Sequence, residues 1–105
     1  MVKFVESEGE WAELMEKSKS QLVVVDFTAS WCPPCRMIAP HFDAMSKEFS
    51  GAIFVKVDVD AQDKIAQRCG VRAMPTFQFY KGGEKADEMC GADVNGLKAK
   101  VTALV

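Results

Sequence analysis

Two apolar runs separated by a helical stretch constrain the fold of this chain most strongly. Residues 22–27 and 53–57 are rich in β-branched and aromatic side chains, which is typical of buried strands. Between them, apolar residues from 38 to 49 recur at helical spacing, and Pro34 lies near the expected helix start. Two successive strands joined through a helix run parallel, with a right-handed crossover. The pattern therefore predicts a β-α-β unit at the centre of the fold.

Further periodic segments extend this unit in both directions. We expect strands at 2–5, 76–81 and 85–89, and helices around 11–18, 65–69 and 94–104. Gly82-Gly83 is a turn signal that pairs the last two strands as a hairpin, and Gly70 can end the short helix. The order βαβαβαββα predicts an α/β fold with a mixed central sheet and helices on both faces. No repeat, low-complexity tract or linker divides the sequence, so we expect one domain over residues 1–105.

The charge and hydropathy of the chain exclude several classes of function. Its 105 residues carry a net charge of -2 with acids and bases interspersed, which leaves no basic stripe to track a nucleic acid. No apolar run approaches the roughly 20 residues that span a bilayer. The first residues lack the long apolar stretch of a secretory signal. We therefore expect a cytoplasmic protein whose partners include neither nucleic acid nor membrane.

Cys32 and Cys35 form the one close cysteine pair, at the junction between the second strand and its helix. Functional sites gather at the carboxyl ends of strands in open α/β sheets, and a helix N-terminus favours a thiolate. We expect Cys32 to be the better exposed thiol and the nucleophile, and Cys35 to close a disulfide with it. Half of a zinc site is the alternative, but Cys69, Cys90 and the single histidine, His41, offer no second half. The pair therefore predicts redox chemistry and no metal.

Asp26 interrupts the apolar strand Val-Val-Val-Asp-Phe, where an ionised carboxylate is costly unless it is paired. Burial would raise its pKa, and a carboxyl group near the base of the active helix could exchange protons with Cys35. Lys56, embedded in the neighbouring strand, is a candidate partner. Two alternatives stay open, namely an exposed acid on a strand face and a buried acid held by hydrogen bonds.

Pro75 and Trp31 are ambiguous by themselves. A proline that opens a strand usually marks only its boundary, and the cis form is a minority geometry. Trp31 could equally be a core aromatic residue. Neither residue indicates a site until the wider pattern is considered.

Four segments in the correct order make the whole pattern resemble the thioredoxin family. They are 25–32 (Val-Asp-Phe-Thr-Ala-Ser-Trp-Cys), 55–60 (Val-Lys-Val-Asp-Val-Asp), 73–77 (Ala-Met-Pro-Thr-Phe) and 90–92 (Cys-Gly-Ala). The likeness runs from Phe4 to the C-terminus of a chain of the right length. It implies the thioredoxin fold, in which four helices flank a mixed five-stranded sheet.

The resemblance implies a role for each matching residue. Cys32 would attack the disulfide of a target protein, Cys35 would resolve the mixed disulfide, and Asp26 would accept and return the proton of Cys35. An apolar surface around the cysteines would bind the substrate, with Pro75 in the cis form. This surface would comprise Trp31, Pro33, Pro34, Val71, Ala73, Met74, Pro75, Gly91 and Ala92.

The same resemblance implies the reaction and its partners. The protein would reduce disulfides in other proteins and would need no tightly bound cofactor. A flavin-dependent thioredoxin reductase would recycle it with electrons from NADPH. Its targets would be disulfide-containing proteins such as peroxiredoxins, ribonucleotide reductase and methionine sulfoxide reductase.

The dipeptide between the cysteines departs from the family pattern, which usually has Gly-Pro where this chain has Pro33-Pro34. The rigid φ and missing amide donor at position 33 should alter the balance between thiolate and disulfide. Pro-Pro resembles the motif of tryparedoxins and nucleoredoxins, which use different electron donors. A donor dedicated to one partner is therefore one alternative to a general reductase, and a redox-dependent binding module is another.

Cys69 and Cys90 are possible regulatory thiols. Cys69 shares a helix face with Ile65, which favours a buried structural thiol. Cys90 precedes Gly91 beside the implied substrate surface, where an exposed thiol could be glutathionylated or could link two chains. We expect a monomer, with Cys90 as the candidate for a disulfide-linked dimer.

Overall fold

The computed structural model describes residues 2–105, and its helices and strands follow the predicted order. The strands are β1 (Lys3–Phe4), β2 (Val23–Thr28), β3 (Ile53–Asp58), β4 (Thr76–Lys81) and β5 (Glu84–Cys90). The helices are α1 (Glu8–Lys17), α2 (Pro33–Glu48), α3 (Asp63–Arg68) and α4 (Val94–Leu104). Across residues 2–105, none of the helices has the length and apolar character that crossing a membrane requires.

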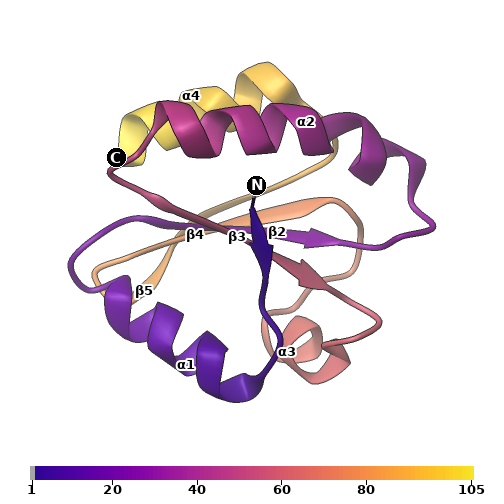
Figure 1. Ribbon diagram of the computed structural model, residues 1–105, viewed down its shortest axis with the longest axis horizontal. Helices are drawn as coiled ribbons and strands as arrows, with labels where there is room; N and C mark the ends of the chain where they lie inside the picture. The colour runs from indigo at the N-terminus through magenta and orange to yellow at the C-terminus, as the bar shows by residue number, and fades with distance from the viewer. Residues whose placement is uncertain (1) are drawn as a thin grey trace.

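A five-stranded sheet in the order β1-β3-β2-β4-β5 runs through the middle of the molecule. β1 and β2 pair parallel with β3, whereas β4 is antiparallel to both β2 and β5. α2 and α4 cover one face of the sheet, and α1 and α3 lie on the other (Figure 1). These pairings confirm the predicted crossover, the hairpin and the mixed sheet between two layers of helices.

β2 is buried on both faces because it lies at the centre of the sheet. Val24 packs into the core under α2 and α4, whereas Val23 and Val25 pack into the core over α1 and α3. Alternate side chains of a strand point to opposite faces, so Asp26 shares the α2 face with Val24. β2 ends at Thr28, and the following turn leads the chain into α2.

α2 packs one apolar stripe against the sheet. Ile38, Phe42 and Met45 are buried at the predicted helical spacing. The centre of the Phe42 ring lies 5.3 Å from that of Phe54 in β3 and 5.7 Å from that of Phe77 in β4, which suits aromatic pairing. These contacts hold α2 across the sheet and thereby fix its N-terminus beside the carboxyl end of β2.

Candidate active site

Cys32 and Cys35 are joined by a disulfide at the start of α2, with their Cα atoms 5.3 Å apart. Cys32 is the N-cap, and Pro33 and Pro34 are the first two helical residues. Proline suits these positions because its φ is already helical and an N–H there has no partner within the helix. The first amide N–H of the helix therefore belongs to Cys35, and it donates to Cys32 Sγ at 3.3 Å. This geometry favours an anionic sulfur at position 32 once the disulfide is reduced.

Both cysteines are more sheltered than the sequence indicated. The exposed fraction is 4 % for Cys32 and 2 % for Cys35, so the expected difference in exposure is small. Ala29, Val59 and Met74 pack against the pair. These residues come from three separate segments. Met74 was expected beside the cysteines from the family resemblance, whereas Ala29 and Val59 were not singled out from the sequence.

Asp26 carries a carboxyl group that is buried in the sheet. It is 1 % exposed, and neither carboxyl oxygen has a partner among the described residues. The pKa of Asp26 is raised to about 7, mainly by burial and in part by the Asp43 carboxylate, against the opposing effect of the Lys56 ammonium. The alternative of an exposed acid is therefore wrong, and no described protein group hydrogen-bonds the two carboxyl oxygens. Lys56 is in register with Asp26 and acts on it through its charge.

The loop before β4 lies beside the cysteine pair. Its Met74–Pro75 peptide bond is cis, as expected, and the Met74 carbonyl oxygen lies 3.7 Å from Cys32 Sγ. The hydroxyl of Thr76 donates to the Ala73 carbonyl at 2.5 Å. The Gly91 N–H donates to the Pro75 carbonyl at 2.9 Å, which joins this loop to the turn after β5.

Trp31 is 60 % exposed, so it is not a core aromatic residue. Its indole N–H donates to Asp60 Oδ2 at 2.9 Å. We did not single out Asp60 from the sequence, although it ends one of the segments that carry the family resemblance.

The other residues of the expected substrate surface differ in exposure. Pro33, Pro34, Ala73 and Ala92 are exposed, Val71, Met74 and Gly91 are half-buried, and Pro75 is buried. Val71 packs against the core on the α1 and α3 face and is separate from the cluster around the cysteines.

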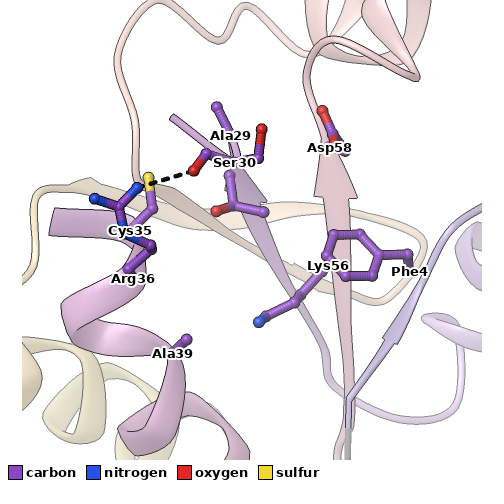
Figure 2. A pocket seen from close by; sticks show the side chains of 9 residues that line it. Phe4, Ala29, Ser30, Cys35, Arg36, Ala39, Lys56 and Asp58 are labelled. Atoms are coloured by element: carbon purple, nitrogen blue, oxygen red, sulfur yellow. Dashed lines mark hydrogen bonds between the residues drawn. The ribbon is translucent and has the colours of Figure 1, made fainter. Parts of the chain in front are cut away.

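A cavity of about 280 Å³ opens behind Cys35, between α2 and the parallel edge of the sheet (Figure 2). Its lining comprises Phe4, Thr28, Ala29, Ser30, Cys35, Arg36, Ala39, Lys56 and Asp58. The Arg36 guanidinium donates to the Ser30 carbonyl at 2.9 Å and so closes one side of the cavity. We predicted neither Phe4 nor Arg36 as part of the site. Arg36 follows Cys35 directly in the sequence, whereas only the strand order places Phe4 near the cavity.

The remaining cysteines lie apart from the disulfide. Cys69 is half-buried at the C-cap of α3, and Cys90 is exposed at the end of β5. Among residues 2–105, no group of three His, Cys, Asp or Glu side chains could hold a metal ion. The arrangement around Cys32 and Cys35 can perform thiol–disulfide exchange, because the disulfide lies at a helix N-terminus whose first amide donates to Cys32 Sγ.

The sequence model of the thioredoxin family matches residues 2–103. The chain belongs to the thioredoxin family. Thioredoxins of Homo sapiens and Equus caballus are 46% and 45% identical to it over 105 residues, which is the whole of each chain. Thioredoxin H4 of Arabidopsis thaliana is 53% identical over 94 residues, covering 87% of this chain and 79% of the relative.

Solved thioredoxin structures share the fold. The thioredoxin of Fasciola hepatica superposes with a TM-score of 0.93 at 39% identity and covers 100% of both chains. Thioredoxin NaTrxh of Nicotiana alata gives a TM-score of 0.91 at 39% identity, covering 98% of this chain and 90% of its own. The expected thioredoxin fold is therefore confirmed.

Membership of the thioredoxin family, together with the disulfide, establishes the reaction. The chain is a protein thiol–disulfide oxidoreductase that reduces disulfides in target proteins through Cys32 and Cys35. A protein-disulfide reductase fits these findings better than a dedicated donor or a binding module. Thioredoxins generally work with thioredoxin reductase and with disulfide-containing proteins.

Proposed function

We propose that Cys32 attacks the target disulfide, that Cys35 resolves the mixed disulfide, and that Asp26 exchanges a proton with Cys35. One observation carries this assignment of roles. The Cys35 N–H donates to Cys32 Sγ, and the carboxyl group of Asp26 is buried on the sheet face that α2 covers, with no hydrogen bond to a described protein group. The hydrogen bond favours the thiolate at position 32. The free carboxyl group is available to serve position 35.

The exchange has two steps. In the first, the Cys32 thiolate bonds to one sulfur of the target disulfide, and the other target sulfur leaves as a thiolate. In the second, the Cys35 thiol passes its proton to the Asp26 carboxylate, and its sulfur attacks Cys32 Sγ. The second target sulfur then leaves as a thiolate. Two electrons pass to the target, and the Cys32–Cys35 disulfide is the oxidised product.

The substrate surface in this proposal surrounds the cysteine pair. Trp31 is exposed but held by a hydrogen bond, so its ring can contact a target at low cost in conformational entropy. An extended target segment would pair with the backbone at Met74, next to Cys32. The other proposed contacts are Pro33, Pro34, Val71, Ala73, Pro75, Gly91 and Ala92.

Under this proposal the chain acts as a single domain and as a monomer in the cytoplasm. An NADPH-dependent thioredoxin reductase would supply its electrons. Peroxiredoxins, ribonucleotide reductase and methionine sulfoxide reductase would be among the proteins that it reduces. Cys90 is exposed and is the candidate for a disulfide-linked dimer, whereas Cys69 and Cys90 together are the candidate regulatory thiols.

Trapping of the mixed disulfide tests the two cysteine roles. The Cys35→Ser variant, incubated with oxidised insulin, should accumulate a covalent complex through Cys32 that dithiothreitol dissolves. The Cys32→Ser variant is the matched control and should trap much less. Equal trapping by the two variants, or trapping by Cys32→Ser alone, would overturn the assignment.

A second comparison separates the general reductase from a dedicated donor. The wild-type protein should reduce insulin and should also be turned over by an NADPH-dependent thioredoxin reductase. Failure of that reductase to turn it over, with retained exchange activity, would favour the dedicated donor.

A further inference from the structure

A row of side chains crosses the sheet from its outer edge to Asp26. Phe4 in β1 is in register with Lys56 in β3, and Lys56 is in register with Asp26 in β2. Adjacent strands lie roughly 4.8 Å apart, and register partners point to the same face. Phe4, Lys56 and Asp26 therefore lie side by side on the face that α2 covers.

The ring of Phe4 contacts the cation in the middle of this row. Lys56 Nζ lies 5.6 Å from the centre of the Phe4 ring, which is within the range of a cation–π interaction. Figure 2 shows the ring beside Lys56, whose ammonium group reaches into the space between β3 and α2. Phe4 is 46 % exposed, so packing in the core does not account for its position.

We propose that Phe4 is a positioning residue, whose ring holds the Lys56 ammonium at the cavity behind Cys35 and within electrostatic range of Asp26. A lysine side chain otherwise tends to extend its charged end into water. Phe4 and Lys56 both line this cavity. Phe4 lies in the edge strand, between the Lys56 ammonium and the solvent beyond the sheet edge. The inference rests on the proposed role of Asp26 as the proton acceptor for Cys35.

The charges that face Asp26 come from two sides. β3 contributes Lys56, and α2 contributes Asp43. α2 also brings Cys35 to the cavity, and its thiol can titrate once the disulfide is reduced. The register partner of Asp26 in β4 is Phe77, which is apolar. Lys56 is therefore the cation that opposes the effects of burial and of the Asp43 carboxylate on Asp26.

Other charged groups near the row have partners of their own. Arg36, across the cavity, donates to the Ser30 carbonyl, and Asp58 accepts the N–H groups of Asp60 and Ala61. In α4, which covers the same face of the sheet, Lys98 pairs with Glu48 and Lys100 pairs with Asp87. Besides its electrostatic attraction to Asp26, the Lys56 ammonium thus has one described contact that can orient it, the ring of Phe4.

The position of Lys56 matters because a nearby cation stabilises the carboxylate form of Asp26. Without the ring, the ammonium group can move into water, where solvent screens its charge. The pKa of Asp26 would then rise above its value of about 7. At neutral pH a smaller fraction of Asp26 would be ionised, and fewer molecules could accept the proton of Cys35.

NMR titration of the Asp26 carboxyl carbon in the full chain tests the proposal. Phe4→Leu, which keeps apolar bulk in β1, should raise the pKa of Asp26 by about half a pH unit, as expected for loss of a partly exposed cation–π contact. Lys56→Met should raise this pKa at least as much. The double variant should match Lys56→Met alone. Phe4→Tyr, which retains an aromatic ring, should restore the wild-type value.

Lys3→Met is the matched control for the loss of a β1 side chain. Lys3 lies next to Phe4 but points to the opposite face, so its replacement should leave the pKa of Asp26 unchanged. An unchanged pKa of Asp26 in Phe4→Leu would overturn the proposal, because the ring would then have no effect on this group. A lowered pKa would overturn it as well, because the ring would then act only by shielding Asp26 from water. An equal rise with and without Lys56 would overturn it too.

A kinetic measurement separates this inference from the role of Asp26 itself. The pH midpoint of the resolving step, followed by stopped flow, should rise in Phe4→Leu by the same amount as the NMR value. A resolving rate that Asp26→Asn leaves unchanged would refute the role of Asp26, while the NMR coupling between Phe4 and Asp26 would remain measurable. If Asp26→Asn slows the resolving step but Phe4→Leu leaves the pKa of Asp26 unchanged, only the role of Phe4 is refuted.

Discussion

The indole N–H of Trp31 donates to Asp60 Oδ2 at 2.9 Å, and this bond ties an exposed ring to the loop after β3. Trp31 precedes the reactive pair, whereas Asp60 follows the strand that neighbours β2. The two residues are 29 positions apart in sequence. An aromatic side chain that faces solvent is thereby held in one orientation next to the disulfide.

Removal of the Asp60 carboxylate should weaken the binding of target proteins and should change the rate of disulfide exchange little. Asp60→Ala should raise KM for insulin roughly fivefold with little change in kcat, as expected for the loss of one hydrogen bond that orients a binding residue. Steady-state insulin reduction measures both constants. Glu13→Ala, which removes an exposed acid from α1, is the control and should leave both unchanged. A selective fall in kcat would contradict the binding role.

Asp26 should make the stability of the protein depend on pH. Its pKa is raised from 3.8 to about 7 in the folded chain. Its contribution to the free energy of unfolding is therefore complete below about pH 4, falls as the pH increases and is lost above about pH 7. The total is on the order of 4 kcal/mol. Urea unfolding of wild type and Asp26→Asn from pH 4 to pH 8 measures this contribution.

The Asn side chain does not titrate, so the comparison isolates the carboxyl group. The stability of Asp26→Asn relative to wild type should improve by about 4 kcal/mol between pH 4 and pH 8. A difference between the two proteins that is constant over this range would show that Asp26 ionises as readily in the folded chain as in the unfolded one.

A thiol probe should label Cys90 before Cys69 in a variant that lacks both active-site thiols. Cys90 is exposed, whereas Cys69 is half-buried and burial raises the pKa of its thiol. The Tyr80 hydroxyl, 3.7 Å from Cys69 Sγ, lowers this pKa by a hydrogen bond, but the effect of burial is larger. Labelling followed by peptide mass spectrometry gives the order. Faster labelling of Cys69 would contradict the difference in exposure.

Gly70 should be needed for its backbone conformation alone. Its φ is 72°, and a Cβ atom at this position would meet nothing within 4 Å. Gly70→Ala should therefore cost on the order of 1–2 kcal/mol through left-handed backbone strain. Gly51→Ala is the matched control, because Gly51 has equal space and lacks a left-handed φ. Thermal unfolding of both variants measures the difference, and equal stability would refute the strain argument.

Local sequence patterns predicted much of the fold, because most helices and strands begin and end at residues that are close together in the sequence. The strand at 76–81 was predicted with its observed bounds, since Pro75 marks its start and Gly82-Gly83 its end. β1 was predicted at 2–5 but spans only Lys3–Phe4, because its length depends on pairing with β3. The role of Gly70 in ending the short helix was predicted from the conformational freedom of glycine, and its φ is positive.

The active site was predictable only where its residues are close in sequence. The spacing of Cys32 and Cys35 was enough to predict the reaction type. The burial of the pair depends on Met74 and on residues from other segments of the chain. The state of Asp26 stayed open because a strand pattern cannot tell whether a buried acid has partners. The contact of Phe4 with Lys56 depends on strand register, which residue patterns in a single sequence do not specify.

The two prolines at the start of α2 have a consequence for how this enzyme can be dissected. The donor to Cys32 Sγ is the main-chain amide of Cys35. In the proposed mechanism, the residue that resolves the intermediate therefore also activates the nucleophile. Replacement of the Cys35 side chain removes the resolving sulfur and leaves this amide in place. The proposed activation of Cys32 thus comes from the backbone, and a side-chain substitution that keeps the helix start intact would not remove it.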